Sequence, residues 1–217
     1  SHEIRTPLNA IVGFSNIIAS NEVELEIEEK VEFVRLINNN CDLLLKLIND
    51  ILDLSRIESG RMEFTFTRQN LTTLINDIYQ THQLLLPDEV KLIQETPEAP
   101  IFIETDRHRL TQVITNLINN AVKFTQKGYI KLGYKYSEAD SSVYITIEDT
   151  GIGIPKEKQK AIFERFNKLD EFAQGTGLGL SICQVIVKRL KGHITLQSEE
   201  RKGSRFTVCL PLIDHQQ

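Results

Sequence analysis

The sequence predicts an α+β fold in two parts: a helical hairpin over residues 1–60, followed over residues 61–217 by a mixed β-sheet with helices on one face. Apolar residues recur at helical spacing before residue 60 and in shorter, often alternating runs after it. The charge divides at the same place, because residues 1–60 hold 5 basic and 11 acidic side chains and residues 61–217 hold 20 and 19. Helices after residue 60 do not alternate strictly with strands, which favours a mixed sheet over a doubly wound parallel one.

The first part has the pattern of two paired helices. An a/d seam at alternating steps of three and four predicts a helix from about Ile27 to Glu58, and the same spacing recurs between Ile4 and Ile18. The acidic stretch from Ser20 to Glu26 separates the two. Two helices with one apolar stripe each cannot bury it alone, so we expect a second copy to complete a dimeric four-helix bundle. Packing of the hairpin against the second part is the alternative. The seam consists of Val34, Ile37, Cys41, Leu44, Ile48 and Ile51.

The second part contains shorter elements. Met62, Phe64 and Phe66 alternate like a half-buried strand, and Asn70 is placed to cap a helix that begins at Leu71. Two further helices are predicted at 106–124 and 177–191. Further strands are predicted at 90–95, 101–105, 129–136, 143–149, 193–198 and 204–211.

Composition excludes several classes of protein. A formal net charge of −5 argues against broad attraction to nucleic acid or to anionic lipid. The three cysteines, Cys41, Cys183 and Cys209, are odd in number and far apart, which predicts buried thiols in a reducing compartment rather than disulfides or a zinc cluster. No apolar run reaches the roughly 18 residues of a membrane span, and no signal peptide is recognisable. We therefore expect this piece to be soluble and cytoplasmic.

One polar face on the helix predicted at 106–124 has the residues of a phosphate and metal site. Asn116, Asn120 and Lys123 lie at i, i+4 and i+7 in the run N-L-I-N-N-A-V-K-F-T. An Asn carbonyl oxygen is a hard, neutral ligand suited to Mg²⁺, which takes the rest of its ligands from water and phosphate. Lys123 adds a positive charge for the same phosphates. A solvated polar face explains any one of these residues taken alone.

Two glycine-bearing loops follow. Asp149 ends an apolar strand and precedes Gly151 and Gly153, so its carboxylate needs hydrogen-bond donors, and the amino group of adenine is a suitable one. An ordinary turn is the alternative. The second loop runs from Gly175 through Gly177 to Gly179 and leads into a helix whose first N–H groups favour an anion. Five of the eleven glycines lie in these two loops, which disfavours flexible linkers.

These motifs resemble, in order, the N, G1, F and G2 boxes of the GHKL (Bergerat-type) ATPase superfamily, with I-F-E-R-F at Ile162–Phe166 as the F box. The resemblance implies an α/β-sandwich domain that binds ATP with Mg²⁺. By resemblance, Asn120 is the Mg²⁺ ligand, Asn116 assists at the metal and phosphates, Lys123 contacts phosphate and Asp149 binds the adenine amine. Lys168, in the lid that follows the F box, would reach the γ-phosphate.

The first nine residues, S-H-E-I-R-T-P-L-N, are similar to the H box of sensor histidine kinases of the HisKA type. The resemblance implies that His2 attacks the γ-phosphate of Mg·ATP with Glu3 as general base, and then passes the phosphoryl group to an aspartate of a response regulator. Thr6 occupies the place where this family orients a water for dephosphorylation of the regulator. Because family members carry several helical turns before the histidine, we expect an N-terminally trimmed core of a longer sensor. Any membrane anchor of that sensor would lie in other segments.

Two other functions fit parts of the pattern. A GHKL ATPase that drives a conformational change has no need of the H box, and it would release phosphate steadily without forming a phosphoprotein. A pseudokinase scaffold would dimerise and bind a regulator, but Asn120, Asp149 and the five loop glycines disfavour it. Labelling of the chain by ATP distinguishes a kinase from a GHKL ATPase that forms no phosphoprotein. A test of Mg·ATP binding distinguishes a kinase from a pseudokinase scaffold.

Overall fold

The computed structural model describes residues 2–20, 25–167 and 176–212. The chain divides into two compact units, of which one contains the hairpin up to Met62 and the other begins at Glu63. Within the described ranges, no helix combines the length and the apolarity needed to cross a bilayer.

The first unit is a helical hairpin, as predicted. Helix α1 (His2–Ala19) pairs with α2 (Ile27–Glu58), and the rings of Phe14 and Phe33 stack between them at 5.6 Å. A capping box starts α2, in which the Glu26 N–H donates to the Glu29 carboxylate at 3.0 Å. Gly60, with φ of +68°, ends the helix in the left-handed conformation that glycine adopts without strain.

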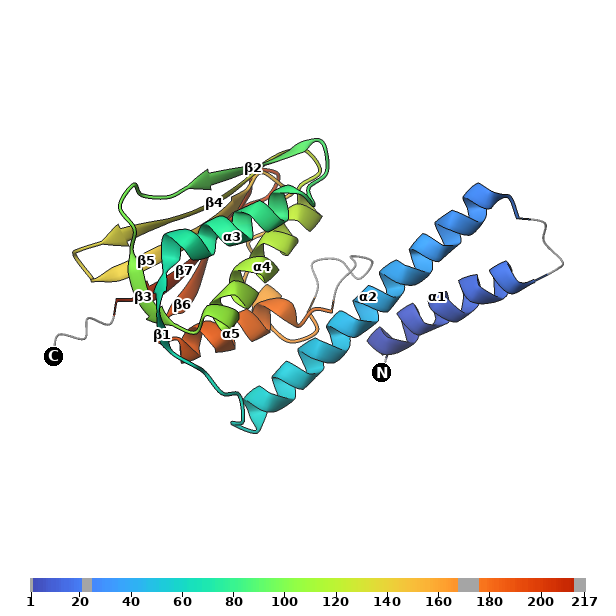
Figure 1. The fold of residues 1–217 in the computed structure, drawn as a ribbon, viewed down its shortest axis with the longest axis horizontal. Helices are drawn as coiled ribbons and strands as arrows, with labels where there is room; N and C mark the ends of the chain where they lie inside the picture. The colour runs from blue at the N-terminus through green and yellow to red at the C-terminus, as the bar shows by residue number, and fades with distance from the viewer. Residues whose placement is uncertain (1, 21–24, 168–175, 213–217) are drawn as a thin grey trace. The chain divides into compact units, whose positions relative to one another are not determined.

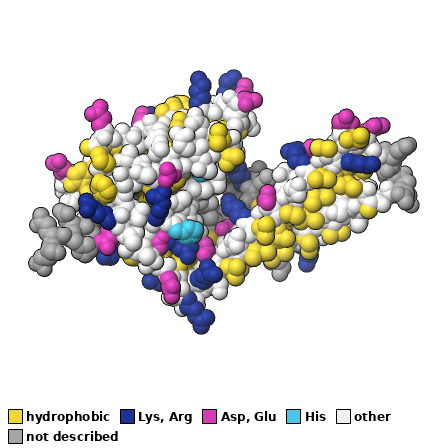
Figure 2. Space-filling view, viewed as in Figure 1, with side chains coloured by type: hydrophobic (Ala, Val, Ile, Leu, Met, Phe, Trp, Pro, Cys, Tyr) yellow, Lys and Arg dark blue, Asp and Glu magenta, His cyan; other side chains and the backbone are white. Residues whose placement is uncertain are grey.

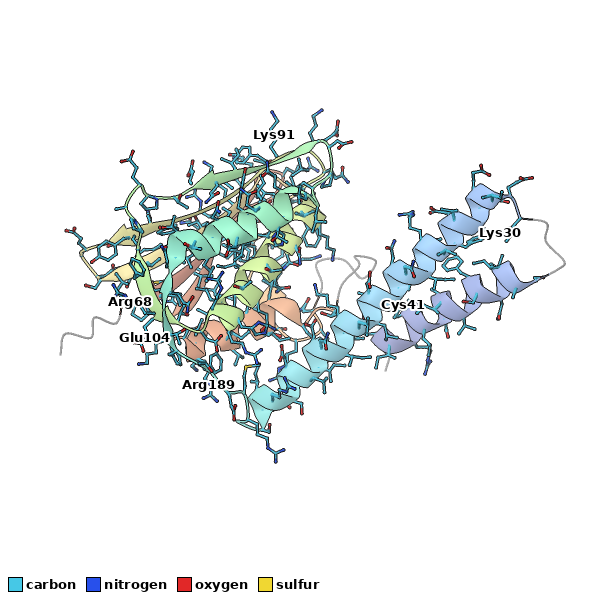
Figure 3. The ribbon with its side chains drawn as sticks, in the orientation of Figure 1. Lys30, Cys41, Arg68, Lys91, Glu104 and Arg189 are labelled. Atoms are coloured by element: carbon cyan, nitrogen blue, oxygen red, sulfur yellow. The ribbon has the colours of Figure 1, made fainter. Side chains whose placement is uncertain are left out.

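The second unit has the predicted mixed sheet, with strands in the order β2-β4-β5-β7-β6. Among these described strands, β2 and β4 run parallel and the other neighbours are antiparallel. A separate two-stranded sheet pairs β1 with β3, where Arg68 lies opposite Glu104 and over the ring of Phe102 at 4.7 Å (Figure 3). The elements are β1 (Thr67–Asn70), α3 (Leu71–Gln83), β2 (Val90–Glu95), β3 (Phe102–Thr105), α4 (Arg107–Phe124), β4 (Gly128–Ser137), β5 (Ser142–Asp149), the 3₁₀ turn η1 (Ala161–Phe163), α5 (Gly179–Arg189), β6 (His193–Glu199) and β7 (Gly203–Pro211).

Helices α3, α4 and α5 cover one face of this sheet (Figure 1). Helix α4 contributes six buried apolar side chains, and each Leu, Ile or Val among them stabilises the fold by about 1.5–3 kcal/mol when fully buried. Asp106 caps α4, since its carboxylate accepts the N–H of Arg109 at 3.0 Å and that of Thr65 at 2.8 Å. The buried apolar face and the Asp106 cap together fix the orientation of α4, and therefore of its polar face. The buried residues of α4 are Leu110, Val113, Ile114, Leu117, Ile118 and Ala121.

The strand expected from the alternation of Met62, Phe64 and Phe66 is absent from the structure, so this prediction was wrong. Residues 62–66 have no regular secondary structure, and strand β1 begins only at Thr67, opposite Thr105. Met62 is buried and the rings of Phe64 and Phe66 stack at 6.3 Å. The alternation therefore reflects side-chain packing, whereas a strand also requires a backbone partner.

The cysteines are free thiols, as expected, and Cys183 and Cys209 are buried. Cys41, on α2 (Figure 3), is only half-buried, which corrects the expectation that all three lie inside. Its seam on α2 is incompletely covered within one chain, because Val34, Ile48 and Ile51 on the same seam are exposed.

Candidate functional site

The polar face of α4 carries Asn116, Asn120 and Lys123, as the spacing predicts. The two asparagines are half-buried and Lys123 is exposed, with its Nζ 4.7 Å from the centre of the Phe124 ring. The buried residues of α4 occupy a different face of the helix, so the two asparagines and Lys123 lie outside its apolar face. The amide oxygens of the asparagines suit a metal cation, and the ammonium group of Lys123 suits the phosphates bound to that cation.

The start of α5 packs directly on Asn116. The amide Nδ2 of Asn116 lies 3.2 Å from the Sγ of Cys183. A Cβ atom added at Gly179 would come within 2.6 Å of both the Nδ2 and the Oδ1 of Asn116. Gly179 therefore permits a close approach between the end of the second glycine loop and α4, two segments that are far apart in the sequence.

Asp149 lies at the end of β5 and is only 7% exposed. Its Oδ1 accepts the N–H of Gly151 at 2.8 Å. Burial raises the pKa of the Asp149 carboxyl, while hydrogen bonds from the backbone of Gly151 and Ser204 act in the opposite direction. A buried, acceptor-rich carboxyl group of this kind is suited to a donor such as an exocyclic amine.

The loop after Asp149 is held on both sides. The N–H of Ile152 donates to the Phe124 carbonyl at the end of α4 at 3.2 Å, and the Arg201 N–H donates to the Ile152 carbonyl at 2.7 Å. Gly153 has φ of +67°, and a Cβ atom there would lie 2.0 Å from the Glu199 carbonyl oxygen. These contacts bring the Asp149 loop, the end of α4 and the β6–β7 turn into one cluster.

Sequence inspection missed the polar residues that support this loop. Ser198 accepts the N–H of Ile154 at 2.8 Å and lies 3.0 Å from the hydroxyl of Ser204. Gln159 donates to the carbonyls of Ile154 and Ser198 at 2.9 and 3.0 Å. Ser198 is separated from its loop partner by more than forty positions. In the sequence, the one indication of this support is that Ser204 follows Gly203 at the start of a predicted strand.

The segment I-F-E-R-F is anchored to the sheet at one end. Ile162 is buried, and the ring of Phe163 packs edge-on against Phe206 of β7 at 6.4 Å between centres. Phe166 is exposed, has φ of +61° and donates its N–H to the Gly177 carbonyl at 2.9 Å. This hydrogen bond joins the end of the I-F-E-R-F segment to the second glycine loop. Lys168 and Gly175, both assigned to the site by resemblance, lie outside the described residues.

The predicted reaction centre of the hairpin lies in the first two turns of α1. His2 begins the helix, Glu3 is half-buried and Thr6 is exposed. Pro7 lies within α1, where it removes one backbone hydrogen bond.

Together, a mixed sheet covered on one face by three helices, an Asn-bearing helix beside a buried Asp and its glycine loop, and a preceding helical hairpin define a two-unit protein with an ATPase-type domain. Residues 105–214 match the family described as histidine kinase-, DNA gyrase B- and HSP90-like ATPase, and residues 1–60 match the His Kinase A (phospho-acceptor) domain. The chain therefore belongs to the HisKA-type histidine kinase family, and the predicted fold class of hairpin plus mixed-sheet ATPase domain is confirmed.

Known proteins resemble the chain over nearly its full length. It is 34% identical to the aerobic respiration control sensor protein ArcB of Escherichia coli strain K12, over 97% of the chain and 27% of that protein. The chain thus spans about a quarter of the length of this relative. Among solved structures, histidine kinase ThkA in complex with response regulator protein TrrA matches 100% of the chain and 60% of its own, with a TM-score of 0.77 and 27% identity. ShkA in complex with AMPPNP matches 97% of the chain and 44% of its own, with a TM-score of 0.74 and 27% identity.

Proposed function

We propose that the chain is the catalytic core of a sensor histidine kinase in a two-component system. The observation that carries the proposal is the joining of a phospho-acceptor hairpin with His2 on α1 to an ATPase-family unit in which α4, the Asp149 loop and the start of α5 converge. The similarity to ShkA with a bound nucleotide analogue supports ATP as the substrate.

In the proposed reaction, a ring nitrogen of His2 forms a bond to the γ-phosphorus of ATP as the bond to the leaving oxygen of ADP breaks. Glu3 takes the proton of the second ring nitrogen. Asp149 accepts a hydrogen bond from the adenine amine, and Lys123 and the N–H groups at the start of α5 bind the phosphates. Phosphoryl transfer depends mainly on positioning and on charge neutralisation, which these groups provide.

The α4 face fits a magnesium ion. Asn120 would be its ligand and Asn116 would assist, since amide oxygens are hard, neutral donors and Mg²⁺ takes few protein ligands. Mg²⁺ supplies neutralisation of the phosphate charge when bound. Lys168 would add a further cation near the γ-phosphate, and Gly175 would belong to the loop around it.

Replacing His2 with Gln is expected to abolish phosphorylation of the chain. Incubation of the wild-type chain with radiolabelled Mg·ATP should give phosphate that is stable in base and labile in acid, as a phosphoramidate is. Gln at position 2 lacks a nucleophilic nitrogen, so the label should fall to background. The matched control is His108→Gln, which replaces an exposed histidine of α4 and should leave labelling unchanged.

Retention of the label in the His2→Gln variant would show that another residue is the nucleophile. Steady phosphate release by the wild-type chain without any phosphoprotein would favour the ATPase alternative. Failure to bind Mg·ATP in calorimetry would favour a scaffold.

We further propose that the hairpin forms a homodimer, as a four-helix bundle. Apolar side chains gather along the hairpin helices (Figure 2), and many of them are exposed within one chain. They include Leu8 and Val12 of α1, and Ile48 and Leu52 of α2. Exposed apolar surface of this extent on two long helices is typical of an interface between copies.

Replacing Ile48 with Glu is expected to weaken dimerisation by about 100-fold, because the twofold arrangement would bring two carboxylates into an apolar interface. Sedimentation equilibrium measures the dissociation constant. Asn39→Glu adds the same charge at an exposed position on the outer side of α2 and serves as control. A dimer that survives Ile48→Glu unchanged would place the interface elsewhere.

The partner that receives the phosphoryl group is, in this proposal, the receiver domain of a response regulator, as the solved complex of ThkA with TrrA suggests. Thr6, exposed on α1 one turn beyond His2, would orient a water for dephosphorylation of that partner. We assign this part of the protein to the cytoplasm, where ATP is found.

A further inference from the structure

Cys183 connects the two motifs that meet at Asn116. Its side chain is 1% exposed, and it lies one helical turn after Gly179, so both residues present the same face of α5 to α4. The Sγ of Cys183 lies 3.9 Å from the carbonyl oxygen of Val113 as donor and 3.2 Å from the Nδ2 of Asn116 as acceptor. The Asn116 amide, the Cys183 thiol and the Val113 carbonyl thus form a short chain of hydrogen bonds.

We propose that Cys183 is a positioning residue that fixes which end of the Asn116 amide faces the phosphates and the cation. The inference rests on the proposed function, because it concerns the same site. The thiol directs its S–H to the Val113 carbonyl, so its sulfur lone pairs face Asn116. Only the NH₂ end of the amide suits such an acceptor, and the Oδ1 end is thereby turned toward the ligand side.

The two ends of an asparagine amide have nearly the same shape, so packing alone does not select one of them. In the reversed orientation, the Oδ1 lone pairs would face the sulfur lone pairs, and the NH₂ group would point at the cation. The backbone of Gly179 lies close to the amide, because a Cβ atom added there would come within 2.6 Å of both its Nδ2 and its Oδ1. Packing near Gly179 therefore limits where the amide lies, and Cys183 determines which of its two ends faces the ligand.

The test compares three variants by calorimetric titration with ATP, with Mg²⁺ and in EDTA. Cys183→Val keeps an apolar group of similar size but offers no acceptor, so the Kd for Mg·ATP should rise about five- to tenfold, as expected for loss of one weak hydrogen bond. Affinity for ATP in EDTA should stay within about twofold. Cys183→Ser retains a donor and an acceptor and should restore most of the affinity. Cys209→Val makes the same change at a buried cysteine outside the site and should alter neither value.

A second readout uses the unliganded wild-type chain and does not depend on a variant that folds. In NMR spectra, the side-chain NH₂ protons of Asn116 should exchange with water at least about tenfold more slowly than those of Asn119, which is exposed on the same helix. Cys183→Val should remove that difference.

The inference is overturned if Cys183→Val binds Mg·ATP as tightly as wild type, if it loses affinity equally with and without Mg²⁺, or if the Asn116 protons exchange as fast as those of Asn119. Failure of the proposed function gives a different result. In that case Mg²⁺ would not improve ATP affinity even in the wild-type chain, and Asn120→Ala would change nothing, while the slow exchange at Asn116 would persist.

Discussion

Replacing Asp149 with Asn should lower the affinity for ATP about 100-fold at pH 7. The substitution puts an NH₂ donor where the proposed adenine amine also donates, so one hydrogen bond to a charged acceptor is lost and one buried donor is left unpaired. Calorimetric titration with Mg·ATP measures the change. Glu148→Gln, which alters the preceding carboxylate on the other face of β5, is the matched control and should leave affinity unchanged.

The same substitution should also shift the preference between nucleotides away from ATP and toward GTP. Guanine presents an acceptor oxygen where adenine presents its amine, so the Asp149→Asn variant should disfavour ATP and tolerate GTP better than the wild-type chain does. An affinity for ATP within about threefold of wild type would show that Asp149 does not contact the base.

The pH dependence follows from the environment of Asp149. Burial raises the pKa of this carboxyl above its value in the unfolded chain, so the ionised form costs stability in the folded state. The stability contribution of Asp149 should therefore improve as the pH falls through the folded pKa, and ATP affinity should weaken in the same range because the ionised acceptor is lost. The Asp149→Asn variant should show neither change, because its amide does not titrate.

Replacing Gly203 with Ala should destabilise the second unit by more than about 3 kcal/mol. Gly203 has φ of +102°, and a Cβ atom there would lie 1.9 Å from the carbonyl oxygen of Asp149 and 2.9 Å from the Cα of Thr150. These atoms belong to the backbone of β5 and its loop, so no side-chain rotation relieves the clash. Because the clash involves the backbone of Asp149, the proposed acceptor of the adenine amine, ATP affinity should fall together with stability.

Urea unfolding followed by tyrosine fluorescence measures this effect, because all five tyrosines lie after residue 62 and the chain has no tryptophan. The matched control is Gly13→Ala in α1, where φ is not positive and a Cβ atom would meet nothing within 4 Å. It should stabilise the hairpin by about 0.5–1 kcal/mol, seen by circular dichroism, and leave the tyrosine transition unchanged. A Gly203→Ala variant with wild-type stability would mean that the β7 start can move away from Asp149.

Local patterns predicted most of the elements. The seam of α2, the Asn70 cap of α3 and the apolar face of α4 each depend on residues within a few turns of one another, so the sequence contains the whole signal. The alternation of Met62, Phe64 and Phe66 misled because a spacing of apolar side chains does not supply the backbone partner, elsewhere in the chain, on which strand formation depends.

The candidate site divides in the same way. Asn116, Asn120 and Lys123 share a face by helical periodicity alone, and Asp149 with its glycines forms one contiguous motif, so both were found in the sequence. Cys183 and Ser198 were missed as site residues, since their partners Asn116 and Ile154 lie far away along the chain. No spacing rule relates residues that meet only after the chain has folded.

The sequence by itself determined a hairpin followed by a mixed-sheet domain, and it determined which residue types are available for phosphate, metal and base. The tertiary structure decided how those residues are held: the burial that raises the pKa of Asp149, the close backbone contact that makes Gly203 necessary, and the thiol that faces the Asn116 amide. The physical reason is that periodicity and propensity are local properties of the chain, whereas burial, close contact and hydrogen-bond polarity arise between segments that folding brings together.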